Sequence, residues 1–265
     1  MIRLWAPDTL WEIAEPLIPP APRRRQGGGR RRTDDRAVLA AIVYVTQAGC
    51  SWWKLPEVSF GVTRATAHRR FAEWTAAGLW LRLHEALLDR LGGGGRIDWS
   101  RAVVDSISVR AEKGDLTGPN LVDRGKPGSK IHVICERTGV PLAVLATAAN
   151  VHDSQVLLPM LDCVPAILTP ARRRRWRPDK LHADKAYDVR ALREEVRRRG
   201  IKVRIARKGV ESSKRLGRHR WIVEACLSWL MRYRRLVRRY DRKGEHYEAS
   251  AVIASALICY RRLTK

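Results

Sequence analysis

The stretch Arg101-Ala-Val-Val-Asp-Ser-Ile-Ser-Val-Arg110 decides the fold, because the apolar pattern changes there from helical to strand-like. In a strand, Val103, Asp105 and Ile107 face one way and the residues between them face the other. Asp is unfavourable inside strands, and a carboxylate among apolar neighbours costs free energy if it is buried alone. Asp105 is therefore an exposed edge residue, half of a structural ion pair or a metal ligand, and we favour the ligand.

The rest of this region alternates between strand-like and helical patterns. Strands are expected at residues 102–109, 130–135, 141–147, 181–183 and 201–206, and helices at residues 153–161, 188–199, 220–240 and 247–263. The order β-β-β-α-β-α-β-α predicts an α/β layer that begins with three sequential antiparallel strands.

The first ~90 residues have a helical pattern instead, with Gly49 expected to end one of the helices. Residues 19–32 interrupt this pattern with three prolines and six arginines, which predicts a flexible basic connector. The four glycines from Gly92 to Gly95 would be costly inside a regular element. They predict a boundary between a domain at residues 1–91 and a domain at residues 97–265.

A short basic helix is expected to begin at Thr63, with Phe71 and Trp74 packing inward. A helix, a break and a short basic helix are what a helix-turn-helix offers to the major groove. A plain surface helix of a small bundle has the same pattern. The residues expected to stay largely outside and to contact DNA are Arg64, Thr66, His68, Arg69 and Arg70.

The charge of the chain indicates a polyanionic partner. The 265 residues include 52 Lys and Arg against 27 Asp and Glu, a formal net charge of +25 that is spread along the chain. Nucleic acid is the favoured partner and an anionic membrane surface is the alternative. No run approaches the ~20 apolar residues of a membrane span, and the N-terminus lacks a signal pattern, so a cytosolic protein is expected. The five cysteines form no Cys-x-x-Cys pair and are expected to be small buried residues.

Two further carboxylates are candidate metal ligands. Asp184 follows a strand end, where sites form in open α/β sheets, although it could instead pair with Lys185 or Arg190. Asp188 suits the N-cap of the following helix better. Glu224 shares a helical face with a residue four positions before it, and alone it would be an ordinary Arg–Glu helix pair. Its weight comes from the other two carboxylates, since hard divalent cations such as Mg²⁺ prefer oxygen ligands.

Three such ligands suit two-metal phosphodiester chemistry, in which two ions about 4 Å apart activate the attacking oxygen and stabilise the leaving one. The chain resembles the DDE transposases of bacterial insertion sequences, in the group typified by insertion sequence five, over residues 5–262. In the catalytic part the resemblance is carried by Val104-Asp-Ser106, Lys130-Ile-His132, His152-Asp-Ser154, Ala183-Asp-Lys-Ala-Tyr-Asp188 and Arg220-Trp-Ile-Val-Glu224. In the helical part it is carried by Leu10-Trp-Glu12, Pro19-Pro20, Thr33-Asp-Asp-Arg-Ala-Val-Leu39, Gly49-Cys-Ser-Trp52, Leu55-Pro-Glu57 and Arg69-Arg-Phe71 with Trp74.

The resemblance implies a ribonuclease-H-like mixed-sheet catalytic core preceded by an all-α helix-turn-helix-type domain. The acidic positions of the family fall on Asp105, Asp184 and Glu224, which would hold two Mg²⁺ ions, with Mn²⁺ as a substitute. Arg220 would orient Glu224 or contact phosphate. The Tyr and Lys positions of the family's C-terminal signature are Gly217 and Met231 in this chain. The basic contact of that Lys position would then pass to Arg232, Arg234 or Arg235.

The function implied is binding of terminal inverted repeats in double-stranded DNA, metal-dependent strand cleavage and transfer to target DNA. A homodimer in the DNA complex, with no membrane partner, and a place in the bacterial cytoplasm at the nucleoid are expected. One alternative is a non-catalytic helix-turn-helix DNA-binding protein with a degenerate ribonuclease-H-like domain. Another is a ribonuclease H-type or repair nuclease that cuts without joining strands.

Overall fold

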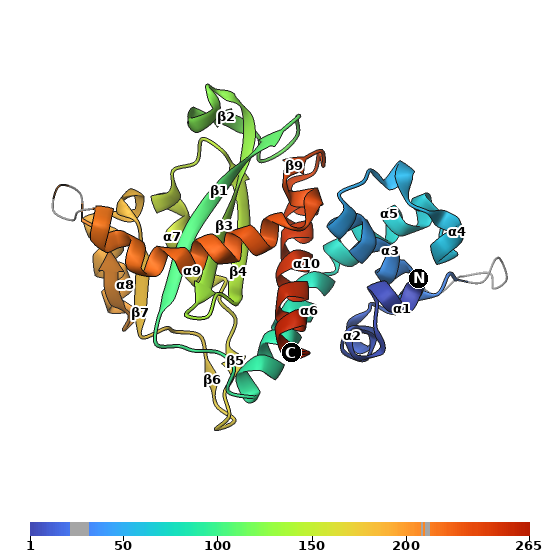
Figure 1. Ribbon diagram of the computed structural model, residues 1–265, viewed down its shortest axis with the longest axis horizontal. Coiled ribbons are helices and arrows are strands. Elements are labelled where there is room, and N and C mark those ends of the chain that lie inside the picture. The colour runs from blue at the N-terminus through green and yellow to red at the C-terminus, as the bar shows by residue number, and fades with distance from the viewer. Residues whose placement is uncertain (22–31, 208, 210–212) are drawn as a thin grey trace.

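A mixed sheet with helices on both faces forms one part of the molecule, and a group of helices forms the other (Figure 1). The computed structural model describes residues 1–21, 32–207, 209 and 213–265, without the side chains of residues 213–219. Most of the expected basic connector, residues 22–31, lies outside the described residues.

The sheet has the strand order of a ribonuclease-H-like core. Its main strands are β1 (Ala102–Ala111), β3 (Lys126–Glu136), β4 (Pro141–Ala148), β7 (Lys180–Ala183) and β8 (Lys202–Ile205). They lie in the order β4-β3-β1-β7-β8, with β1, β3 and β4 antiparallel and β7 and β8 parallel to β1. The mixed α/β core and its three initial antiparallel strands are therefore confirmed.

The shortest strands were not predicted from the sequence, because a segment of two or three residues is too short to show an alternation of apolar and polar side chains. These are β2 (Gly118–Asn120), which pairs with β3, β9 (Arg238–Arg239), which pairs with β1, and a separate pair of β5 (Ile167–Leu168) and β6 (Arg174–Arg175).

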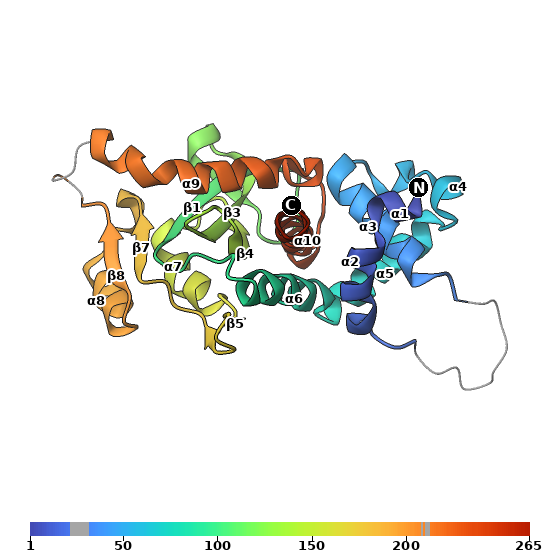
Figure 2. The same ribbon diagram turned by 60° about the horizontal axis from the view of Figure 1, so that its bottom comes forward.

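Helices cover both faces of the sheet (Figure 2). On one face α7 (Asp153–Asp162) contacts β1, β3 and β4, and α8 (Arg190–Arg198) contacts both α7 and β8. On the other face α9 (Ser213–Met231) crosses β1 and β3. The last helix, α10 (Gly244–Leu263), packs against β4 and against α6 (Leu79–Gly93).

The expected helix at residues 220–240 is wrong in its C-terminal half, since α9 ends at Met231. The chain then forms a 3-10 turn, η5 (Arg234–Leu236), and strand β9. The guanidinium of Arg239 is buried and donates hydrogen bonds to Ser129 Oγ at 2.8 Å and to the Asp241 carbonyl at 2.9 Å. The long-range contact with Ser129, together with the pairing of β9 with β1, outweighs the helical pattern of the sequence.

The N-terminal region is helical, as expected. Its helices before α6 are α1 (Ile2–Trp5), α2 (Asp8–Ala14), α3 (Asp35–Ala48), α4 (Glu57–Phe60) and α5 (Arg64–Ala76). Gly49 ends α3 in the left-handed conformation at φ 68°, and the Thr63 hydroxyl caps α5 by accepting from the Thr66 N–H. The close helix–turn–helix pair is α4 and α5, joined by residues 61–63, because the link from α3 to α5 is much longer than the ~3–4 residues of such a turn.

The expectation that Gly92-Gly-Gly-Gly95 would lie outside a regular element is wrong for its first half, since α6 continues through Gly93. Gly92 lies against Ile167 and Leu168 of β5, where a side chain would not fit. The helix thus passes from the helical region to the sheet region and packs along α10. The division at residues 91 and 97 stays a prediction.

The structure bears on two expectations from composition, the first about membrane-spanning helices and the second about the burial of the cysteines. Along the described ranges, no helix combines the length and apolar character needed to span a bilayer. Of the cysteines, which are all free, Cys135, Cys226 and Cys259 are buried, as expected, whereas Cys163 is exposed and Cys50 lies between these classes.

The contact of Gly92 with β5 gives a stability prediction. A Cβ at Gly92 would overlap the Leu168 carbonyl oxygen and lie 2.6 Å from Ile167 Cγ2. We expect Gly92→Ala to lower the free energy of unfolding by about 1–3 kcal/mol through overpacking. In Gly93→Ala the Cβ would meet Leu168 Cδ2 at 3.5 Å, so this neighbouring variant is the control and should match or exceed the wild type. Urea unfolding measures both, and equal effects would contradict the close packing.

Candidate active site

Strand pairing brings Asp105 and Asp184 to the same level of the sheet. In the parallel pair of β1 and β7, Val103 lies opposite His182. Continuing this register by two residues places Asp105 opposite Asp184, the first residue beyond the carboxyl end of β7. Asp184 also accepts a hydrogen bond of 2.8 Å from the Ala186 N–H and so caps the 3-10 turn η4 (Lys185–Tyr187).

Asp105 is buried and needs a positive partner. It is 8% exposed, and its Oδ1 accepts a hydrogen bond of 2.9 Å from the Ser106 N–H. Burial raises the pKa of Asp105, the Ser106 hydrogen bond and Arg220 lower it, and the nearby carboxylate of Asp184 raises it again. The ionised form of Asp105 is therefore stabilised by any cation that approaches it.

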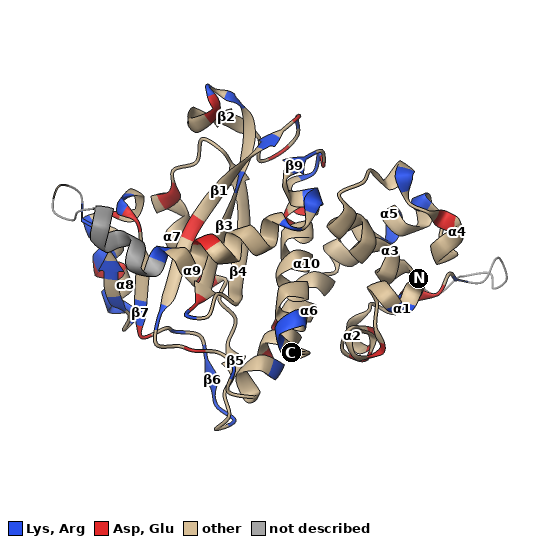
Figure 3. Ribbon diagram, viewed as in Figure 1, with Lys and Arg blue, Asp and Glu red and all other residues tan. Residues whose placement is uncertain are grey.

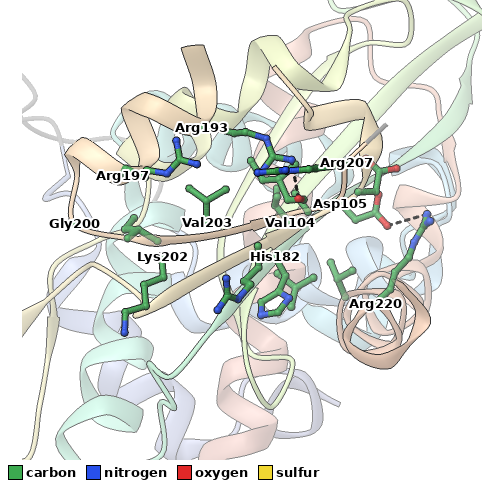
Figure 4. A pocket seen from close by; sticks show the side chains of 17 residues that line it. Val104, Asp105, His182, Arg193, Arg197, Gly200, Lys202, Val203, Arg207 and Arg220 are labelled. Atoms are coloured by element: carbon green, nitrogen blue, oxygen red, sulfur yellow. Dashed lines mark hydrogen bonds and ion pairs between the residues drawn. The ribbon is translucent and has the colours of Figure 1, made fainter. Parts of the chain in front are cut away.

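Arg220 joins Asp105 to Glu224. From α9 its Nη2 lies 3.3 Å from Asp105 Oδ2, and its Nε lies 3.3 Å from Glu224 Oε1 (Figure 4 shows the first contact). The Glu224 side chain is 59% exposed. The ordinary Arg–Glu helix pair is thus present, but its arginine also reaches the buried aspartate on the sheet.

Asp105 and Asp184 lie opposite each other and line a cleft. Their carboxylate oxygens are ligands of the kind that a hard divalent cation prefers. Within the described residues, no three His, Cys, Asp or Glu side chains are close enough to form a complete ligand set. Glu224 meets Asp105 only through Arg220. Asp105 and Asp184 are therefore the two candidate ligands that the sheet pairing brings together.

The cleft beside these carboxylates is strongly basic. It has a volume of about 800 Å³, and Asp105, Asp184 and Arg220 line it. Its other cationic lining residues are Arg193, Arg197, Lys202, Arg204 and Arg207 (Figure 4). Carboxylates set among cations in one cleft suit a polyanion that must be held close to bound metal.

Comparison with known proteins assigns the family. Residues 100–259 match the family described as "Transposase DDE domain", and residues 7–84 match one assigned to the transposases of the IS4/5 family. The chain belongs to the DDE transposases.

Individual relatives agree with this assignment. The chain is 39% identical over 165 residues to the transposase assigned to insertion sequence element IS402 of Burkholderia cepacia, covering 62% of this chain and 77% of that protein. It is 46% identical over 105 residues to an uncharacterized 16.2 kDa protein of the same element, covering 39% of this chain and 71% of that protein.

Solved structures similar to the transposase are remote. A pre-cleavage Mos1 transpososome has 11% identity and a TM-score of 0.27, with 92% of this chain and 82% of that chain covered. The catalytic domain of Mos1 mariner transposase has 10% identity and a TM-score of 0.28, with 70% and 92% covered. The fold assignment of the transposase therefore rests on its strand order and its family.

The sequence reading missed a polar cluster around Asp153, on the α7 face of the transposase sheet. Asp153 Oδ1 accepts hydrogen bonds of 2.9 Å from Lys130 Nζ and 3.1 Å from Ser106 Oγ, and lies 3.8 Å from His132 Nδ1. The signal was available, since these residues lie in the strings that carry the family resemblance. Their common location required the pairing of β1 with β3, where Ser106 lies opposite His132.

Tyr187 also lies near the carboxylates. Its hydroxyl is buried and has no hydrogen-bond partner in the part of the transposase that the structure describes. Burial raises the pKa of Tyr187, and the nearby charges of Asp153, Asp105 and Asp184 raise it further. Tyr187 is thus a neutral phenol facing three acidic groups.

The predicted cap at Asp188 is wrong. Val189 precedes α8 at the N-cap, and Asp188 instead accepts a hydrogen bond of 2.7 Å from Arg193 Nε. Arg190, proposed as an alternative partner for Asp184, bonds to Glu194 at 2.9 Å. Asp184 is therefore not held in an ion pair with Arg190.

The residues of α5 divide into two groups. Arg64 and Arg69 are exposed, with Arg64 stacked 3.9 Å from the ring centroid of exposed Trp53. Arg70 is only 4% exposed and lies 2.8 Å from Asp35, so the expectation that it stays outside is wrong. Arg70 lies against α3, where Asp35 is located. Its guanidinium can be buried there because the Asp35 carboxylate pairs with it.

Two other predicted contact residues on α5 are constrained by neighbours. Thr66 takes part in the cap made by Thr63. The ring of His68 lies against Trp52 and His246, at centroid distances of 5.3 and 5.9 Å. Burial and Arg235 lower the pKa of His68, which favours the uncharged form of its ring.

Among the arginines considered for the basic contact of the Met231 position, Arg235 is buried and pairs with Asp241 at 2.6 Å. Arg232 and Arg234 are exposed and remain available.

The Asp153 cluster gives a second stability prediction. Lys130 and Asp153 have side chains only 12% and 19% exposed. Lys130→Met would leave the carboxylate of Asp153 without its cation, so we expect the free energy of unfolding to fall by about 3 kcal/mol. The double variant Lys130→Met/Asp153→Asn should recover part of this loss, because the uncompensated charge is gone. Guanidinium unfolding tests the pair, and a Lys130→Met protein as stable as wild type would contradict it.

Proposed function

We propose that the transposase binds the terminal inverted repeats of its element through residues 1–91 and cleaves and transfers DNA strands through residues 97–265. The observation that carries this proposal is the parallel register of β1 with β7, which places Asp184, just beyond β7, opposite Asp105 beside a cationic cleft. Membership of the DDE transposases supports it.

The DDE transposases are metal-dependent enzymes, and we propose Asp105, Asp184 and Glu224 as the ligands of two Mg²⁺ ions, with Mn²⁺ as a substitute. Bound ions would activate the attacking oxygen and stabilise the leaving oxygen. Glu224 lies on α9 one turn from Arg220, which also contacts Asp105, and its carboxylate would turn toward the aspartates when the ions bind.

The protein groups prepare the site in three ways. Sheet pairing fixes the backbone of Asp105, and the Ser106 N–H fixes its carboxylate orientation. Asp184 is held by the cap of η4. The planar guanidinium of Arg220, placed between Asp105 and Glu224, can present its remaining N–H groups to a phosphate oxygen of the substrate.

The reaction would proceed in two displacements. In the first, the oxygen of water bonds to phosphorus at the end of the element, the bond from phosphorus to O3′ breaks, and a 3′-hydroxyl and a 5′-phosphate result. In the second, that 3′-oxygen bonds to a target phosphorus while the target's own bond from phosphorus to O3′ breaks.

Recognition of the ends is proposed for the surface of α5, with Arg64 and Arg69 as the exposed basic contacts and Thr66 and His68 beside them. Arg70 is excluded from this set by its burial. One chain presents one α4–α5 pair among the described residues. Joining two ends needs two such surfaces, so we propose a homodimer in the DNA complex.

Substitution of the proposed ligands tests the active site. Asp105→Asn, Asp184→Asn and Glu224→Gln should each reduce cleavage of a labelled terminal repeat at least about 1,000-fold, because lost metal stabilisation is worth several kcal/mol. Binding of the same DNA in a gel-shift assay should persist. Glu194→Gln, at an exposed carboxylate on α8, is the control and should cleave normally. Normal cleavage by any of the three ligand variants would refute its assignment.

Two neighbouring arginines test the end-binding surface. Arg69→Ala should weaken binding of the terminal repeat by about 1–3 kcal/mol and leave the unfolding midpoint unchanged, because its side chain is 68% exposed. Arg70→Ala should do the reverse, lowering the free energy of unfolding by about 2 kcal/mol through loss of its buried contact with Asp35. Fluorescence anisotropy and thermal unfolding measure the two effects. Equal loss of affinity in both variants would argue against α5 as the contact surface.

A further inference from the structure

A strip of cations lies along the edge strand of the transposase sheet, beside the carboxylates. We call Lys202, Arg204 and Arg207 the β8 strip. Lys202 and Arg204 are two residues apart on β8 and so project to the same side, about 6.6 Å apart. Arg207 follows the strand, and all three are exposed and line the cleft that contains Asp105 and Asp184.

The strip is continuous with the active site across the sheet. Arg204 lies opposite His182 of β7, which lies opposite Val103 of β1. Asp105 is two residues further along β1 than Val103. A chain of phosphates passing the carboxylates toward the sheet edge would therefore meet the strip next.

Among the residues that the structure describes, the strip has no carboxylate partner, in contrast to the helix beside it. On α8, Arg190 pairs with Glu194 and Arg198 pairs with Glu195. No ion pair within the described residues involves a member of the β8 strip. Exposed like charges on one strand repel each other, so an anionic partner would stabilise this arrangement.

The strip and the proposed end-binding helix lie at opposite ends of the molecule. Figures 1 and 2 both place α5 at one end of the long axis and α8, with its strands β7 and β8, at the other, and the sheet lies between. Figure 3 shows basic residues gathered around α8. DNA held by α5 and passing the carboxylates would reach the strip only on the far side of the reacting phosphate.

We propose that the β8 strip binds the phosphate backbone of duplex DNA without regard to sequence, on the side of the active site away from α5. The proposal rests on the proposed function for the role of the site. Flexible cations on a strand contact phosphates, whereas base reading needs side chains that enter a groove on a helix or ribbon. The strip would therefore hold DNA outside the terminal repeat, such as flanking or target DNA.

The test compares two doubly substituted full-length proteins. Lys202→Gln/Arg204→Gln removes two strip cations, and Arg190→Gln/Arg198→Gln removes two exposed cations from α8 as a control with the same charge change. The probes are a fluorescent duplex of random sequence and one carrying the terminal repeat, titrated in EDTA at several salt concentrations. Thermal unfolding checks that both variants fold.

We expect the strip variant to bind the random duplex at least about tenfold more weakly, with the slope of log affinity against log salt reduced by about two. The control variant should bind the random duplex like wild type. Arg69→Ala should show the opposite selectivity and lose affinity only for the terminal repeat.

Three results would overturn the proposal: wild-type binding of the random duplex by the strip variant, an equal loss in the control, or a loss confined to the terminal repeat. These results are independent of the proposed function, because no cleavage is measured. If the Asp105→Asn protein cleaved normally while the strip variant still lost random-duplex binding, the catalytic assignment would fail and the strip would stand.

Discussion

The parallel pairing of β1 with β7 is the constraint on which the candidate active site depends. Parallel strands cannot be joined by a tight turn, so the chain between them must build β3, β4 and α7 before it returns to the sheet. The return pairs β7 with the first residues of β1, and continuing this register places Asp184 opposite Asp105. A slip of one residue in β7 would turn its side chains to the opposite face and separate the two carboxylates.

The burial of Asp105 explains much of what surrounds it. A carboxylate that is 8% exposed costs free energy unless hydrogen bonds or cations compensate, and here the Ser106 N–H and Arg220 do so. The helix α9 therefore lies across β1 for an electrostatic reason as well as an apolar one. Its apolar face, including Val223 and Leu227, is buried, while Arg220 reaches Asp105 on β1.

Local patterns were sufficient to predict the main strands, the positions of Asp105 within a strand and of Asp184 after one, and the Thr63 cap of α5. Asp105 was recognisable because a charge interrupts an apolar alternation, and Asp184 because it follows a strand end. Contacts distant in sequence were not accessible in this way. Arg70 has the same periodicity as an exposed residue, and only the packing of α3 against α5 brings Asp35 to it. Gly92 looked like a break because glycine weakens helices, yet its missing side chain is what lets α6 approach β5.

Glu224 shows how far such reasoning extends. Its sequence context predicts a pair with Arg220, and the structure contains that pair. Arg220 also contacts Asp105, so one guanidinium joins the helix pair to the sheet carboxylate. A cation that binds Asp105 would compete with Arg220 for the same oxygen. The guanidinium would then be free for a phosphate, and Glu224 would be free to turn inward, so one displacement would prepare both groups.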